Sequence, residues 1–146
     1  MQEAENQIIT HYEVFAERPE DSRLLIAAVK QHQRLFGRAP RIVAADAGFY
    51  SLKNEQVIQT MGATRGAVPN RNSKSSERRK LQRTRWFRAG QRWRTGCEGR
   101  ISVLKRRHGL NRCRYRGFEG MRRWVGLGVL ADNLIQIGRC LTVQRA

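Results

Sequence analysis

Two acidic residues stand where a carboxylate could do chemistry. Asp46 follows the apolar run at residues 41–45, which predicts a buried strand with a carboxylate at its C-terminal end. Glu98 is isolated among basic residues, and Arg94 lies four positions before it. Each also has a plainer interpretation, because an Asp at a strand end often caps a turn and a Glu beside an Arg often forms a surface ion pair.

Taken together, the two carboxylates suit phosphodiester chemistry. Cleavage and transfer of phosphodiesters often use two divalent metals about 4 Å apart, held by carboxylates. Mg²⁺ prefers oxygen ligands and keeps several waters, so few protein carboxylates suffice. On a helix with about 100° per residue, Arg94, Glu98 and Lys105 share one face. We therefore expect Asp46 and Glu98 to be catalytic metal ligands, and Arg94 and Lys105 to hold backbone phosphates.

The elements that must position these groups follow an α/β pattern. β-Branched and apolar runs predict strands at residues 8–15, 41–45 and 64–68. Helical spacing predicts helices at about 24–36, opened by Asp21 or Ser22, and at about 52–61, capped by Ser51. Strands that alternate with helices indicate an α/β fold. Basic, mainly helical sequence follows, with helices predicted at about 91–108 and from Phe118 onward.

Net charge is unevenly distributed along the chain. Residues 1–70 hold 8 Lys or Arg and 8 Asp or Glu, whereas residues 71–124 hold 19 basic and 3 acidic residues, a net charge of +16. Basic sequence of this density indicates a polyanionic partner, most simply nucleic acid, although a solvated charged face is the alternative. The clusters expected to contact phosphates are Arg78, Arg79 and Lys80, and Lys105, Arg106 and Arg107.

Composition excludes several other classes of protein. The three cysteines, Cys97, Cys113 and Cys140, are odd in number and scattered, which fits a reducing compartment better than a disulfide framework. No apolar run approaches 18 residues, and the N-terminus lacks the features of a signal peptide. We expect no membrane partner and a cytoplasmic, nucleoid-associated location in a bacterium.

Two segments resemble the DDE-type insertion-sequence transposases. AADAGFYS (residues 44–51) resembles the segment around the second catalytic Asp of that family, and RTGCEGRISVLKRRHGL (residues 94–110) resembles the signature of the third acidic residue, in which Tyr, Arg, Glu and Lys recur. Arg94, Glu98 and Lys105 match that spacing. Gln91 stands at the Tyr position, and Ala47 replaces the usual basic residue. The similarity covers about residues 8–140.

The resemblance implies an incomplete RNase H-like fold. Residues 1–146 correspond to a partial catalytic domain with an α/β part at about 8–70 and a basic helical part at 71–140. The first catalytic Asp and the first two strands of the family are not found. Without those strands, residues 8–15 would have no strand neighbour and one edge of residues 41–45 would be exposed. We expect the chain alone to be marginally stable and inactive.

The implied function is DNA transposition. The family uses Mg²⁺ or Mn²⁺ to cleave the ends of an element and join them to target DNA. The implied partners are DNA and either a second copy of the chain or a complementary N-terminal segment, which a second reading frame could supply. The alternative is a non-catalytic, basic nucleic-acid-binding protein, whose DNA affinity would not depend on Asp46, Glu98 or magnesium.

Overall fold

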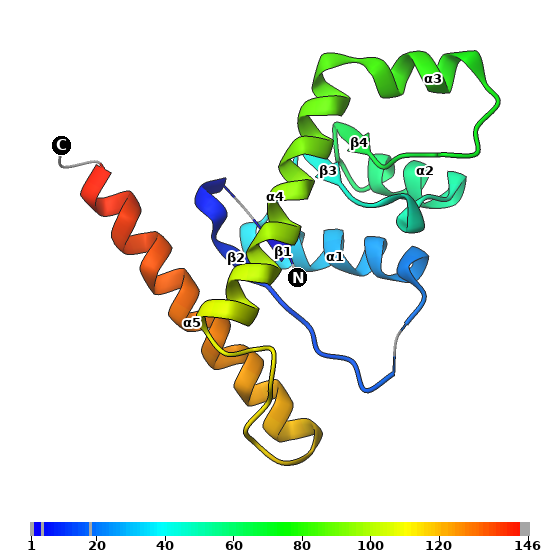
Figure 1. Ribbon diagram of the computed structural model, residues 1–146. Coiled ribbons are helices and arrows are strands. Elements are labelled where there is room, and N and C mark those ends of the chain that lie inside the picture. Colours follow the sequence, from blue (N-terminus) through cyan, green and yellow to red (C-terminus); the bar gives the residue numbers. More distant parts are fainter. Residues whose placement is uncertain (1, 4, 18, 144–146) are drawn as a thin grey trace. The chain divides into compact units, whose positions relative to one another are not determined.

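The computed structural model describes residues 2–3, 5–17 and 19–143, which fall into two compact units (Figure 1). We call residues 18–96 the sheet unit, and residues 1–17 together with 97–146 the terminal unit. In chain order the elements are β1 (Gln2–Glu3), the 3-10 helix η1 (Glu5–Gln7), β2 (Ile9–His11), α1 (Asp21–Phe36), β3 (Ile42–Ala44), the 3-10 helix η2 (Ala47–Phe49), α2 (Leu52–Thr60), β4 (Arg65–Ala67), α3 (Ser76–Arg83), α4 (Arg85–Arg107) and α5 (Gly117–Val143).

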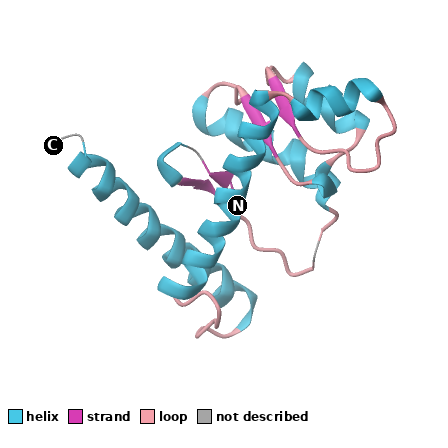
Figure 2. Ribbon diagram, turned by 45° about the horizontal axis from the view of Figure 1, so that its top comes forward, coloured by secondary structure: helices cyan, strands magenta, loops and turns pink. Residues whose placement is uncertain are grey.

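A two-stranded parallel sheet lies at the centre of the sheet unit (Figure 2). β3 and β4 pair in the register Ile42 with Arg65 and Ala44 with Ala67. Parallel neighbours need a crossover, and α2 supplies it between the two strands. The predicted alternation of strands and helices is therefore confirmed over this part of the chain. Since both strands run the same way, their carboxyl ends lie at the same edge of the sheet.

Helices α1 and α2 of the sheet unit begin and end largely as predicted. α1 ends at Gly37, whose φ of 67° is the left-handed conformation that Gly adopts most readily. Ser51 caps α2, because its side chain accepts a hydrogen bond from the Asn54 N–H. The predicted cap of α1 was wrong: Glu20 holds that position without a side-chain cap bond, and Asp21 lies in the first turn.

Small and aliphatic side chains form the core of the sheet unit. The strand at residues 41–45 was predicted to be buried, but only Val43 of β3 is buried, and Ile42 is 38% exposed. A short strand beside one other strand can bury a single face, so its alternate side chains stay outside. The buried members of this core are Leu25, Val29, Val43, Ile58, Ala63 and Val68.

The first predicted strand is shorter than expected and does have a neighbour. β2 pairs antiparallel with β1, with Gln2 opposite His11 and Glu3 opposite Ile9. The prediction that this strand would lack a strand neighbour is therefore wrong. The two residues of β1 are polar, so no hydrophobic pattern marked them as a strand.

A side chain completes the hydrogen bonding of β2. The Ile9 N–H donates to Asn133 Oδ1 at 2.8 Å, and Asn133 Nδ2 donates to the Ile9 carbonyl at 2.9 Å. One amide side chain from α5 thereby satisfies both backbone groups of Ile9, as a neighbouring strand would. Ile9 is 4% exposed and packs in a second core with Leu104 and Val129. Packing and hydrogen bonding together fix β2 to α5.

Helix α5 leaves one long apolar face exposed. Val129 is buried, but the aliphatic side chains at the opposite face are between 45% and 61% exposed. Their spacing of three and four residues places them in one stripe along the helix. The stripe consists of Leu127, Leu130, Leu134, Ile137 and Leu141. Even so, no helix in the described part of the chain combines the length and apolar character that a bilayer crossing requires.

Helix α4 begins six residues before its predicted start and crosses the boundary between the two units at Gly96 and Cys97. Two glycines in this region, Gly96 and Gly99, have open space where a side chain would begin, since no atom lies within 4 Å of a Cβ built there. Gly is less favourable than Ala in a helix interior by about 1 kcal/mol. The sequence therefore weakens α4 here without a packing reason.

We expect Gly96→Ala and Gly99→Ala each to raise the free energy of unfolding by about 0.5–1 kcal/mol. Urea unfolding followed by circular dichroism measures this change. Gly90→Ala in the same helix is the matched control, because its Cβ would lie 2.9 Å from Ala67 Cβ. The control should destabilise the protein. Destabilisation by the Gly96 or Gly99 change would show that these positions pack more closely than the structure places them.

Candidate functional site

Asp46 lies at the carboxyl end of the parallel sheet, as predicted. Its backbone is extended, and its side chain caps η2, with the Ala47 N–H donating to Asp46 Oδ1 at 2.7 Å. The carboxylate keeps 49% of its side-chain surface exposed. The capping role that was the alternative interpretation is therefore real, but it uses one oxygen of the carboxylate. Because the group stays accessible, capping and metal binding are compatible.

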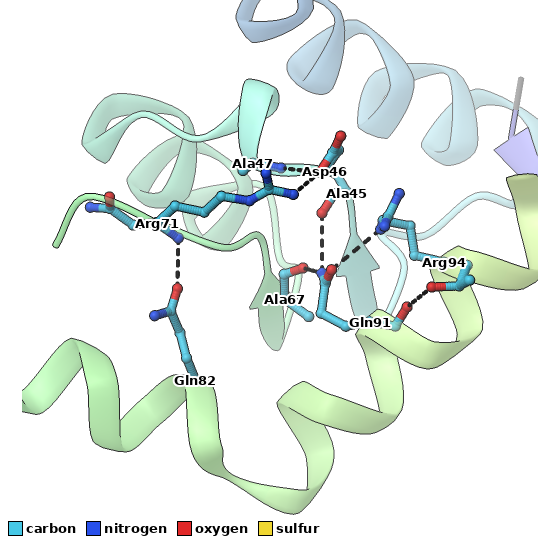
Figure 3. A network of polar contacts seen from close by, with 10 residues as sticks. Ala45, Asp46, Ala47, Ala67, Arg71, Gln82, Gln91 and Arg94 are labelled. Atoms are coloured by element: carbon cyan, nitrogen blue, oxygen red, sulfur yellow. Dashed lines mark hydrogen bonds and ion pairs between the residues drawn. The ribbon is translucent and has the colours of Figure 1, made fainter.

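A residue that the sequence analysis did not single out lies beside this carboxylate. Arg71 Nη2 is 3.7 Å from Asp46 Oδ1, and the Arg71 side chain is 77% exposed (Figure 3). An exposed pair at this distance contributes little to stability. The pair matters because of its place: it brings the guanidinium of Arg71 beside Asp46, the expected metal ligand. Arg71 follows the turn after β4, and loops after parallel strands converge at this edge. That rule was the signal that could have revealed it.

Gln91 on α4 joins the ends of the two strands. Its Nε2 donates to the Ala45 carbonyl at 3.1 Å and also to the Ala67 carbonyl (Figure 3). These carbonyls belong to the residue before Asp46 and to the last residue of β4. The amide therefore holds α4 against the sheet edge that carries Asp46.

Gln91 also contacts Arg94, one turn further along α4. Arg94 Nε donates to Gln91 Oε1 at 3.3 Å (Figure 3). With both polar ends of its amide engaged, Gln91 restricts the orientation of the Arg94 side chain. The sheet unit thus brings Asp46, Arg71, Gln91 and Arg94 to one edge.

Glu98 and Lys105 lie further along α4, within the helix predicted to carry them. Both residues are exposed and belong to the terminal unit, whereas Asp46 and Arg94 belong to the sheet unit. The contacts of Asp46 and Arg94, the two expected site residues in the sheet unit, are therefore known. That Glu98 and Asp46 share one site stays a prediction.

Comparison with known proteins supplies the family. A family model described as "Transposase DDE domain" matches residues 58–138, which is more than half of the chain. The chain belongs to this family. No curated protein and no solved structure matches it. The family implies an RNase H-like fold, with which the mixed α/β architecture agrees, and a DNA substrate.

The region that matches the family model contains most, but not all, of the expected site residues. Residues 58–138 include β4, α3, all of α4 and most of α5, and so contain Gln91, Arg94, Glu98 and Lys105. Asp46 precedes the matched region. Its assignment as a transposase metal ligand therefore depends on the resemblance of residues 44–51 and on its place at the sheet edge.

The basic residues predicted to contact DNA differ in their surroundings. Those with exposed side chains are Arg79, Lys80, Lys105, Arg106 and Arg107. Arg78 instead points into the sheet unit, where Nη1 lies 2.5 Å from Glu55 Oε1 and Nη2 donates to the Val68 carbonyl at 2.6 Å. Its guanidinium also lies over the Tyr50 ring, 4.8 Å from the centroid. These internal contacts occupy Arg78, and its predicted role in DNA binding stays a prediction.

Transposase DDE domains use divalent metal, and the acidic residues here provide suitable oxygen donors for Mg²⁺ or Mn²⁺. Asp46 has the accessible carboxylate that such a role requires. Within the described ranges, no three side chains among His, Cys, Asp and Glu gather closely enough to bind a metal by themselves. That Asp46 and Glu98 contribute to a metal site stays a prediction.

Proposed function

We propose that this chain carries two of the acidic residues with which a transposase cleaves DNA and joins the ends to a target. The observation that supports this most directly is the sheet edge itself: an accessible Asp46 at the carboxyl ends of two parallel strands, beside a helix that carries Arg94 and lies in the family-matched region. In open α/β sheets, chemistry collects at this edge.

The proposed roles follow from the chemistry of each group. Asp46 and Glu98 would hold divalent metal, and the metal, when bound, would activate water or a 3′-hydroxyl and stabilise the leaving oxygen. Arg94, oriented by Gln91, would hold a phosphate close to Asp46. Lys105 would hold a second part of the DNA backbone. A further acidic residue, from a complementary segment or a second reading frame, would complete the site.

A cleavage assay tests this proposal. The chain is combined with the complementary segment, and magnesium-dependent cleavage of DNA that carries the element ends is measured. We expect Asp46→Asn and Glu98→Gln each to reduce cleavage by about 100-fold or more, since even changes behind a metal ligand can cost 10- to 100-fold. Glu77→Gln is the matched control, because it removes an exposed carboxylate in the first turn of α3.

The alternative is a basic nucleic-acid-binding protein without catalysis, which the charge of residues 71–124 favours. Under this alternative the restored protein would show no cleavage that depends on Asp46 or Glu98. DNA affinity would be the same in EDTA and in magnesium. That combination of results would reject the catalytic proposal and leave DNA binding as the function.

A further inference from the structure

A pocket of about 430 Å³ lies within the sheet unit, and one of its lining residues, Arg71, also pairs with Asp46. The loop after β4, helix α3 and the first turns of α4 supply its lining, and Phe87, which is 2% exposed, gives it an apolar wall. The volume is in the range of small-ligand sites and exceeds what a single small ion needs. None of the cavity residues belongs to the terminal unit.

The polar groups of this pocket are suited to a phosphate. Arg71, Arg79 and Arg88 line it, and no carboxylate is among its lining residues. The planar guanidinium matches phosphate oxygens through paired N–H donors. All three side chains are exposed, so they are accessible to a phosphate on DNA. Of the three, only Arg79 was singled out by its place in a basic cluster.

Contacts within the lining hold part of the pocket in place. Gln82 Oε1 accepts a hydrogen bond from the Asn70 N–H at 2.6 Å, which connects α3 to the loop after β4. Arg79 Nε donates to the Ser73 carbonyl at 3.4 Å, so its side chain lies along the same loop. These contacts reduce the conformational freedom that would be lost when a ligand is bound.

Two residues connect the pocket to the proposed catalytic edge. Arg71 lines the pocket and also lies 3.7 Å from Asp46 Oδ1. Gln91 lines the pocket and donates to the Ala45 carbonyl, one residue before Asp46. Both connections lie within the sheet unit. A DNA strand with one phosphate at Asp46 would therefore have a neighbouring phosphate within reach of the pocket.

We propose that this pocket binds a backbone phosphate of the DNA strand that is cleaved, through Arg71, Arg79 and Arg88. This inference rests on the proposed function for the identity of the strand. Arg71 then has two alternative anionic partners, the Asp46 carboxylate and the phosphate. Contact of Arg71 with the phosphate would place that phosphate beside the accessible carboxylate of Asp46.

Salt-dependent DNA binding by the 146-residue chain tests the pocket without requiring cleavage. The probe is a fluorescein-labelled DNA duplex, and its anisotropy is measured over a range of salt concentrations in EDTA. We expect the double variant Arg79→Gln/Arg88→Gln to flatten the slope of log K against log salt by about two, since each lost phosphate contact contributes about one. Circular dichroism verifies that each variant is folded.

Arg83→Gln/Arg85→Gln is the matched control, because it removes the same charge from exposed positions on α3 and α4 outside the pocket lining. Its slope should change by less than half as much. Equal flattening by the two double variants would overturn the inference, since general charge would then explain the binding. An unchanged slope in the pocket variant would overturn it as well.

Inorganic phosphate tests whether the DNA occupies this pocket. If it does, sodium phosphate should displace the duplex from the wild-type protein better than sodium chloride of equal ionic strength, and the pocket variant should lose this difference. Saturable phosphate binding that is lost in the pocket variant but leaves the duplex bound would instead assign the pocket to a free anion and overturn the DNA proposal. A flattened slope in EDTA together with cleavage insensitive to Asp46 and Glu98 would keep the pocket and reject the catalytic proposal.

Discussion

Replacing Asp132 with asparagine is expected to lower the free energy of unfolding by about 3–5 kcal/mol, the usual cost of removing one partner from a buried ion pair. Asp132 is 1% exposed and lies in α5. Arg100 Nη1 is 3.3 Å from each of its carboxylate oxygens, and His108 Nε2 is 3.3 Å from Oδ1. Asparagine keeps the shape but leaves the buried Arg100 charge without a counter-ion. Urea unfolding of the terminal unit measures the loss.

Glu119→Gln is the matched control on the same helix. Glu119 pairs with Arg122 at the surface, where the two side chains are 68% and 57% exposed, and its loss should change stability by no more than about 0.5 kcal/mol. Arg100→Met combined with Asp132→Leu should recover much of the loss, because both charges are then absent. A change below about 1 kcal/mol for Asp132→Asn would mean that water reaches this pair.

Arg78→Ala is expected to destabilise the sheet unit by about 3 kcal/mol. The Arg78 side chain is 10% exposed and its partner Glu55 is 18% exposed, so the pair is largely shielded from water. Removing the guanidinium leaves Glu55 without its cation and the Val68 carbonyl without its donor. The stability of Arg78→Lys should lie between those of the wild type and Arg78→Ala, because an ammonium keeps the charge but not the fork geometry.

Lys80→Ala, two residues further along α3, is the control, since Lys80 is exposed and should contribute less than about 0.5 kcal/mol. The same variants separate structure from DNA contact. If Arg78 is structural, Arg78→Ala, measured under conditions where it is folded, should leave the salt slope of DNA binding unchanged while stability falls. Normal stability of Arg78→Ala with a flattened slope would instead favour the DNA contact that the sequence predicted.

Local signals predicted much of the fold. The β-branched runs and the glycine at a positive φ marked β3, β4 and the end of α1, because these features depend on neighbours in the chain. The side-chain hydrogen bonds that complete β2 could not be predicted in this way. They come from Asn133, which is 124 residues from Ile9 and reaches it only in the folded state. The sequence also did not predict which side chains of α5 are buried, because its apolar residues occur on more than one face and the pattern does not show which face is covered.

For the candidate site, too, local signals could be predicted and contacts between distant segments could not. Asp46 and Glu98 were found from strand-end position, helix spacing and resemblance, all of which are visible in one sequence. Arg71 was not found, since its meaning depends on the approach of one loop to another strand end. Arg78 shows the converse, because a charge cluster in the sequence did not reveal that one member points inward. A cluster of charges predicts a class of partner, but it does not predict the direction of each side chain.

The amide of Gln91 has a spectroscopic consequence. Its Nε2 group donates to the Ala45 carbonyl just after β3 and to the Ala67 carbonyl at the end of β4, so its protons are engaged by two different backbone segments. Such protons resonate downfield and exchange slowly with solvent compared with the amides of exposed Gln or Asn side chains. In a nitrogen–proton correlation spectrum, the paired signals of this single side chain report on the separation of the two strand ends. The Gln91 Nε2 group, bonded to the residue before Asp46, would thus register DNA or metal at that edge, whether or not any bond is cleaved.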